Sequence, residues 1–154
     1  MLMQDEVYCC DADALIDLAN AGFIKDLRKL ALLGRLKIPG AVTRDLRKRS
    51  DLGKRIAAWK TTYGVVLELD LPALTLLPDI ETKYGNGFNI GGMTYPGLWA
   101  GPRARKSADA QVIALAKARA WTVISNDKSV HGACALEDVP CRRWEEVTRA
   151  LRSL

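Results

Sequence analysis

Four aspartates have a residue type and a placement that could support chemistry. Asp11 and Asp127 each follow a short apolar run of the kind that forms a buried strand. Asp109 opens an alanine-rich segment with helical spacing, and Asp45 lies one turn into a segment that follows a further apolar run. Carboxylates that converge repel one another unless a cation is present, and all-oxygen ligands suit Mg²⁺ or Mn²⁺. These residues therefore predict a divalent-metal site.

Each aspartate alone also has a structural explanation. Asp11 and Asp109 suit the start of a helix, where a carboxylate satisfies free backbone amides. Asp127 suits a turn, and Asp45 can pair with Arg49 four residues later on a helix. The joint placement of the four acids favours one functional site over four separate structural roles.

The elements that must position these acids alternate between strands and helices. Short apolar runs predict strands at residues 6–10, 36–39, 65–69, 121–125 and 139–141. Helical spacing and capping residues predict helices after Asp11 or Asp13, over 24–33, after Pro39, around 56–59, at the start of 72–80, over 107–120 with Ser107 as N-cap, near 130–135 and over 144–151. Alternation of this kind predicts a three-layer α/β/α fold around a mostly parallel sheet, with the ligand site at the carboxyl ends of the strands.

Residues 85–103 interrupt the alternation. They contain six glycines and two prolines and no phosphate-binding glycine motif, which predicts a long loop without regular structure. Phe88, Tyr95 and Trp99 in this loop could stack on nucleic-acid bases or pin the loop to the core. The sequence alone leaves both interpretations open.

Length and composition indicate a single globular domain over residues 1–154. The hydrophobic share is 49% and the charged share is 27%, and no apolar run is long enough for a membrane span. The N-terminus does not have the pattern of a signal peptide, so we expect a cytoplasmic protein with reduced cysteines. The single His131 is expected to be a surface or packed residue.

Charge is unevenly distributed along the chain. Residues 1–20 carry five acids and no Lys or Arg, whereas residues 43–60 carry seven bases and two acids. A second basic group lies at 101–106. Such a pattern suits a polyanion bound by the bases while the acids hold a metal, although a basic run is also typical of a solvated helix face.

Several motifs occur in the order found in one known family. VYCCDADALIDL combines a strand, an acid and an aliphatic helix, IPGAVTRDLRK carries an acid on the next helix, and SADAQVIALAKARAWTVISND adds two more acids around a strand. Over roughly residues 5–142 the chain resembles the PIN-domain nucleases, including the VapC-type toxins of bacterial toxin–antitoxin pairs.

The resemblance implies a metal-dependent endoribonuclease. In this family pattern Asp11, Asp109 and Asp127 would hold Mg²⁺ or Mn²⁺, and Asp45 would assist. The ion would activate a water that attacks the RNA phosphodiester. RNA is then the expected substrate, and an antitoxin protein and a second copy of the chain are expected partners. Candidates to orient the ligands are Asp13, Ser125 and Asn126, and candidates for phosphate contacts are Arg47, Lys48, Arg103, Arg105 and Lys106.

Two departures from the family pattern bear on the site. The family usually has Glu where this chain has Asp45, whose side chain is one methylene shorter. It usually has Ser, Thr or Asn where this chain has Asp13, and the extra carboxylate could strengthen metal binding or cap the helix. The 85–103 loop is also longer than in compact toxins.

Two other functions fit parts of the sequence. A catalytically degenerate PIN domain would bind RNA or a protein partner without cleaving it, and the shorter Asp45 favours that alternative. The DxD at Asp11 and Asp13 after a strand also resembles the haloacid-dehalogenase phosphatases. That family needs a later pair of acids, for which NDKSVH at 126–131 offers only one.

Overall fold

A parallel sheet forms the centre of the molecule in the computed structural model, which describes residues 6–99 and 108–154. Its strands are β1 (Tyr8–Cys10), β2 (Leu36–Pro39), β3 (Val66–Leu67), β6 (Thr122–Ile124) and β7 (Cys141–Arg142). They lie in the order β3-β2-β1-β6-β7, and every neighbouring pair is parallel. This arrangement confirms the predicted α/β fold class.

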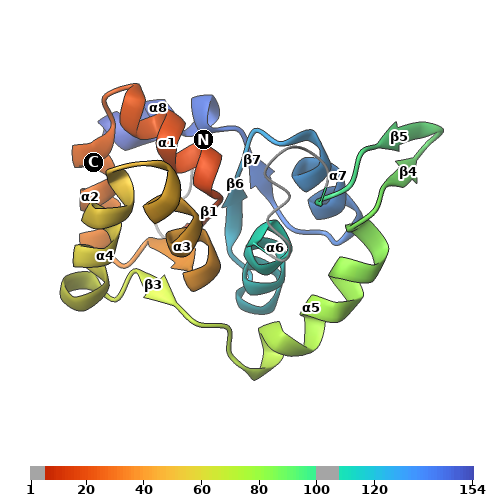
Figure 1. Ribbon diagram of the computed structural model, residues 1–154. Coiled ribbons are helices and arrows are strands. Elements are labelled where there is room, and N and C mark those ends of the chain that lie inside the picture. The colour runs from red at the N-terminus through yellow and green to blue at the C-terminus, as the bar shows by residue number, and fades with distance from the viewer. Residues whose placement is uncertain (1–5, 100–107) are drawn as a thin grey trace.

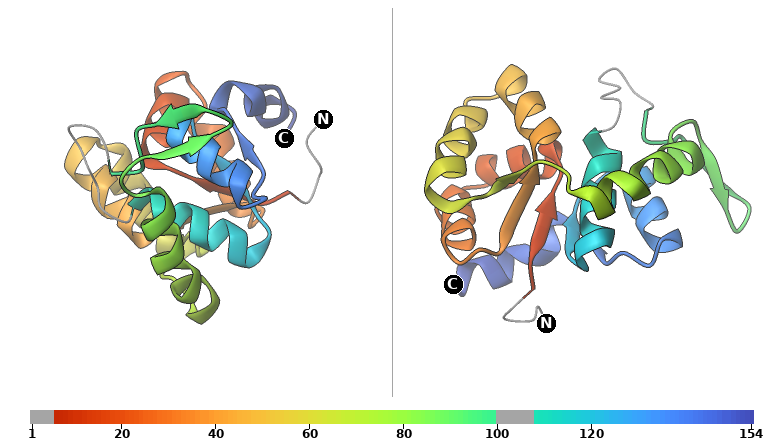
Figure 2. Two further views of the ribbon diagram at one scale, coloured as in Figure 1. Left: turned by 90° about the vertical axis from the view of Figure 1, so that its right-hand side faces the viewer. Right: turned by 90° about the horizontal axis from the view of Figure 1, so that it is seen from below.

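Helices cover both faces of the sheet, as Figures 1 and 2 show. Parallel strands joined by right-handed crossovers place successive helices on one face while the chain moves in one direction across the sheet. One face carries α1 (Ala12–Asn20), α2 (Ile24–Leu32), α3 (Gly40–Arg49), α4 (Leu52–Tyr63) and α8 (Trp144–Arg152). The other face carries α5 (Leu71–Tyr84), α6 (Ala108–Arg119) and α7 (Lys128–Leu136).

The core lies between the sheet and both helix layers. On the first face α1 buries Leu15 and Leu18, as its helical spacing requires. On the second face α6 is buried along most of its circumference, because it lies between the sheet and α5. The four cysteines are free thiols. In the part of the chain described, no helix is long and apolar enough to cross a membrane.

The prediction of an irregular loop over 85–103 was wrong for its central part. Residues Phe88–Ile90 form β4 and Met93–Tyr95 form β5, an antiparallel hairpin that projects beyond α7 in Figure 1. Gly91 and Gly92 both have positive φ, which a two-residue hairpin turn requires and which glycine adopts without strain. The glycines that seemed to exclude regular structure therefore form its turn. Residues 100–103 lie outside the described residues, as does Ser107.

Two element lengths also differ from the prediction. The helix expected only at the start of 72–80 is α5, which continues to Tyr84 even though Pro78 lies within it. Asp70 caps its start by accepting a hydrogen bond from the Ala73 amide at 3.2 Å. The strand expected over 65–69 is shortened to Val66–Leu67, because β3 is an edge strand with only β2 as its neighbour.

Candidate active site

The carboxyl ends of β1 and β6 form the centre of the candidate site. These two strands are neighbours, paired from Tyr8 with Thr122 to Cys10 with Ile124. From β1 the chain crosses to β2 on one side, and from β6 it crosses to β7 on the other side, so the connections leave these two neighbouring strands in opposite directions. Ligands bind in open α/β sheets at such a switch point. Asp11 and Asp127 follow these two strands, as the sequence predicted.

Asp11 is held at this edge by the start of α1. Its Oδ1 accepts a hydrogen bond of 2.8 Å from the amide of Ala14, so the residue is the N-cap of the helix. The side chain is buried, and the hydroxyl of Ser125 also hydrogen-bonds to it. Burial, followed by the charges of Asp13 and Asp127, raises the pKa of Asp11 to about 7 despite these two hydrogen bonds.

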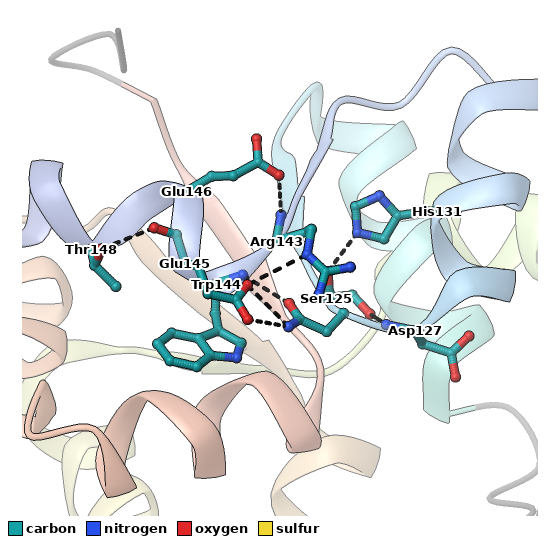
Figure 3. Close-up of polar contacts among 9 residues, drawn as sticks. Ser125, Asp127, His131, Arg143, Trp144, Glu145, Glu146 and Thr148 are labelled. Carbon is teal, nitrogen blue, oxygen red and sulfur yellow. Dashed lines mark hydrogen bonds and ion pairs between the residues drawn. The ribbon is translucent and has the colours of Figure 1, made fainter.

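Asp127 is held in the same way by α7. Its Oδ1 accepts hydrogen bonds from the amides of Ser129 at 2.8 Å and Val130 at 3.0 Å. The Asp127 amide donates to the hydroxyl of Ser125 at 3.0 Å, and His131 Nε2 donates to the Ser125 carbonyl at 2.6 Å (Figure 3). Buried Ser125 thus contacts both aspartates, while its predicted role in orienting metal ligands stays a prediction.

Asn126 stabilises the opposite side of the same turn. Its Oδ1 accepts from the Trp144 amide at 2.9 Å, and its Nδ2 donates to Glu145 at 2.9 and 3.1 Å. Arg143 joins the group through Glu145 at 3.5 Å. Figure 3 shows the Asp127 carboxylate pointing away from this group. The contacts of the Asn126 side chain therefore anchor α8, while its predicted role toward the acids stays a prediction.

Asp109 connects the remaining acids electrostatically. It lies in the first turn of α6, and its pKa is raised well above the ordinary value of 3.8. Burial is the largest cause, and the charges of the other acids add to it: Asp11, Asp127, Asp13 and Asp45. The charges of four other carboxylates thus act on Asp109, two at the ends of strands and two on α1 and α3.

Asp45 is buried on α3 and forms an ion pair with Arg49 one turn later. Arg49 Nη1 lies 2.9 Å from Asp45 Oδ2, which confirms the i,i+4 pairing that the sequence indicated. The other end of the guanidinium, Nη2, bonds to Oδ1 of Asp13 on α1. Burial alone would lower the pKa of Arg49, but its hydrogen bonds to Asp13 and Asp45 raise it. Arg49 thus joins the two residues that depart from the family pattern.

Comparison with known proteins identifies the fold. No family model and no curated protein matches the chain in sequence. In structure it is similar to PAE2754 from Pyrobaculum aerophilum, with a TM-score of 0.54 at 14% identity over 97% of this chain and 98% of that one. A chain of FitAB bound to an IR36 DNA fragment gives a TM-score of 0.51 at 16% identity, over 90% of this chain and 95% of that one. A chain of VapBC-1 from nontypeable Haemophilus influenzae gives a TM-score of 0.51 at 12% identity, over 90% of this chain and 98% of that one. This chain has the PIN-domain fold.

The donor set of this PIN-fold site fits a divalent cation in its chemistry. Asp11, Asp109 and Asp127 offer only carboxylate oxygens, which Mg²⁺ and Mn²⁺ prefer. Burial and mutual repulsion raise the pKa of the first two, and a cation would relieve both effects. Within residues 6–99 and 108–154, however, no three His, Cys, Asp or Glu side chains are grouped closely enough to hold an ion as they stand.

Exposed basic residues lie close in sequence to two of the acids, Asp45 and Asp127. Arg47 and Lys48 are exposed on α3, and their predicted contacts with phosphates stay a prediction. Arg103, Arg105 and Lys106 lie outside the described residues. The structure adds Lys128, which directly follows Asp127 and lies 5.1 Å from the centre of the Tyr95 ring. Sequence reasoning missed Lys128, although its position next to a predicted ligand was a usable signal.

The aromatic residues of the hairpin pack on the protein. Phe88 and Tyr95 stack at 5.1 Å between ring centres, and both lie against Gly132 of α7, where an added Cβ would come within 3.2 Å of each ring. Lys128 lies over the ring of Tyr95, and Tyr84 meets Phe88 edge-on. The indole of Trp99 lies against Gly85. These contacts favour the interpretation that the aromatics pin the segment to the core.

Proposed function

We propose that the chain is a metal-dependent endoribonuclease that hydrolyses RNA phosphodiester bonds. Asp11, Asp109 and Asp127 would hold Mg²⁺ or Mn²⁺. The observation that carries this proposal is the raised pKa of Asp11 and Asp109, caused by burial and by neighbouring carboxylates at the switch point of the sheet. Buried acids beside other carboxylates destabilise a fold unless a bound cation compensates for their charge.

The chain's own residues would keep the carboxylates in position. The amides at the starts of α1 and α7 fix Asp11 and Asp127, and Ser125 hydrogen-bonds to both residues. A bound divalent ion would supply Lewis-acid polarisation of the phosphate and a water of lowered pKa. Exposed Arg47, Lys48 and Lys128 would bind the flanking phosphates through charge, which positions the strand without reading its sequence.

Cleavage of a single-stranded RNA in Mn²⁺ buffer tests this function. Wild-type protein should cleave, and EDTA should stop it. Asp11→Asn keeps the helix cap but removes a charged ligand, so we expect cleavage to fall by about 100-fold or more. Asp17→Asn, which changes a half-buried acid on the same helix, is the matched control and should cleave normally. Undiminished cleavage by Asp11→Asn would exclude the proposed site.

The proposed biological role is that of a toxin paired with an antitoxin. Two of the similar structures, FitAB and VapBC-1, support this role, and the FitAB structure is bound to DNA. A cytoplasmic location and a homodimer belong to the same proposal. A small DNA-binding protein encoded immediately upstream, which co-purifies with the chain and suppresses its RNA cleavage, is the expected partner.

One observation favours a second candidate function. Arg49 already neutralises Asp45, the acid that stands where the family usually has Glu. A catalytically degenerate PIN domain that binds RNA without cleaving it would have this arrangement. RNA binding by the wild-type protein without cleavage in Mg²⁺ or Mn²⁺ would support that candidate. Turnover of a small phosphomonoester without RNA cleavage would instead support the phosphatase alternative.

A further inference from the structure

Arg49 is the cation that contacts two of the five interacting carboxylates at this edge. It reaches Asp45 on its own helix and Asp13 on α1, and its side chain is only 13% exposed. The two acids differ sharply in exposure, since the side chain of Asp45 is 7% exposed and that of Asp13 is 69% exposed. The guanidinium therefore links a buried carboxylate to one at the rim of the site.

The charges divide the five carboxylates into two groups. A guanidinium presents paired donors in a fixed fork and can satisfy two carboxylates at once, as Arg49 does here. Asp13 and Asp45 share this positive charge. Among residues 6–99 and 108–154, by contrast, no Lys or Arg forms an ion pair with Asp11, Asp109 or Asp127. A divalent cation at this edge would therefore compensate mainly the charges of Asp11, Asp109 and Asp127.

We propose that Arg49 takes the place of a second metal ion and limits the site to one divalent cation. This inference rests on the proposed metal-dependent function and assigns the stoichiometry of the same site. Arg49 is a positioning residue in this arrangement, because it holds Asp45 and Asp13 together and keeps both from joining a metal. The same contact explains why this chain can carry an extra acid at position 13.

Removing the guanidinium of Arg49 should change the number of divalent ions that the site binds. In Arg49→Met a buried carboxylate loses its positive partner, which is strongly unfavourable unless another cation replaces it. Asp13 and Asp45 are then available to a second Mn²⁺. We expect wild-type protein to bind one Mn²⁺ per chain and Arg49→Met to bind two, as counted by electron paramagnetic resonance and calorimetric titration. Saturating Mn²⁺ should also raise the melting temperature of the variant more than that of wild type.

Matched variants separate this effect from a general loss of charge. Arg49→Lys keeps a positive charge at the bridge and should bind one ion. Arg44→Met removes an arginine from the same helix that lies 3.7 Å from Glu68, with both side chains exposed, and it should also bind one ion. Arg49→Met combined with Asp13→Asn removes a ligand of the new site and should return the count to one.

The possible outcomes distinguish this inference from the function on which it rests. No Mn²⁺ binding by wild type would overturn both. One ion in wild type and one in Arg49→Met would overturn the role of Arg49 alone, and so would two ions in wild type. If Arg49→Met does not fold, Arg49→Gln can still hydrogen-bond to Asp45 without a charge, and it should bind two ions.

Discussion

Two buried carboxylates in this molecule have opposite environments. Asp11 lies at the carboxyl edge of the sheet, where burial and acidic neighbours raise its pKa to about 7. Glu137 follows α7 and is also buried, although less deeply than Asp11, and its pKa is lowered. The desolvation of Glu137 is outweighed by hydrogen bonds from Lys117 and Tyr84 and by the charges of Lys117 and Lys83.

The difference lies in the partners of the two acids, which are basic around Glu137 and acidic around Asp11. Lys117 Nζ lies 2.6 Å from Glu137 Oε1, so the charge of Glu137 is satisfied within the protein and ties α6 to the end of α7. Asp11 receives hydrogen bonds from Ala14 and Ser125, but the charges that shift its pKa are the negative ones of Asp13 and Asp127. A buried acid with acidic neighbours indicates a candidate functional site, because ionising it there costs free energy that a helix cap alone does not require.

The largest expected effect on stability comes from Glu137→Gln. This change leaves Lys117 without its carboxylate and weakens the contact with Tyr84. Removing one partner of a buried ion pair costs about 3–5 kcal/mol, and the partial exposure of Lys117 reduces our expectation to about 2–3 kcal/mol of unfolding free energy. Urea denaturation measures the loss, with the exposed Glu68→Gln as control. An unchanged midpoint of denaturation would show that the ion pair of Glu137 does not stabilise the fold.

The same acid-to-amide change at Asp11 should raise the free energy of unfolding, whereas Glu137→Gln should lower it. Asp11→Asn removes a buried negative charge and can still cap α1. Each unit by which a pKa is raised corresponds to about 1.4 kcal/mol at a pH where the acid is ionised. Because the neighbouring acids titrate together, we expect a gain of about 1–2 kcal/mol in urea denaturation at pH 8 with EDTA. A loss of stability there would mean that Asp11 is a structural acid like Glu137.

The acids of the site could be predicted because strand ends are visible in the sequence. Asp11 and Asp127 follow apolar runs, and the order of elements brings those runs together as β1 and β6. The Asp45–Arg49 pair was also within reach, since four residues on a helix are always neighbours. The contact of Arg49 with Asp13 spans 36 positions and depends on how α1 packs beside α3. No local pattern contains that packing.

The hairpin and the Glu137 group show why other features were missed. In FNIGGMTY the composition indicated a loop, although a Gly-Gly pair between two short alternating runs is itself a hairpin signal. The partners of Glu137 are 20 and 53 residues away in the sequence, on α6 and α5. Glycine-rich composition was given too much weight in the first case. Long-range packing was not available to sequence reasoning in the second.

The smallest expected effect is a difference in pH dependence between the two regions. For Asp11 the folded-state pKa lies above the ordinary value of 3.8, so its contribution to stability is complete below about pH 4 and is lost as the pH rises through about 7. For Glu137 the folded-state pKa lies below 4.5, so its contribution is complete above that pH and is lost in acid. Metal-free wild type should therefore lose about 1 kcal/mol between pH 5 and 7.

Variants assign the two parts of this pH profile to the two regions. Asp11→Asn should flatten the loss between pH 5 and 7, because the group that ionises at a cost is gone. Glu137→Gln should leave that loss in place and weaken the dependence below pH 4.5. Urea denaturation in EDTA across pH 3.5–8 measures both profiles. If Asp11→Asn kept the full loss between pH 5 and 7, the ionisation would belong to Asp109, the other acid of the site whose pKa is raised.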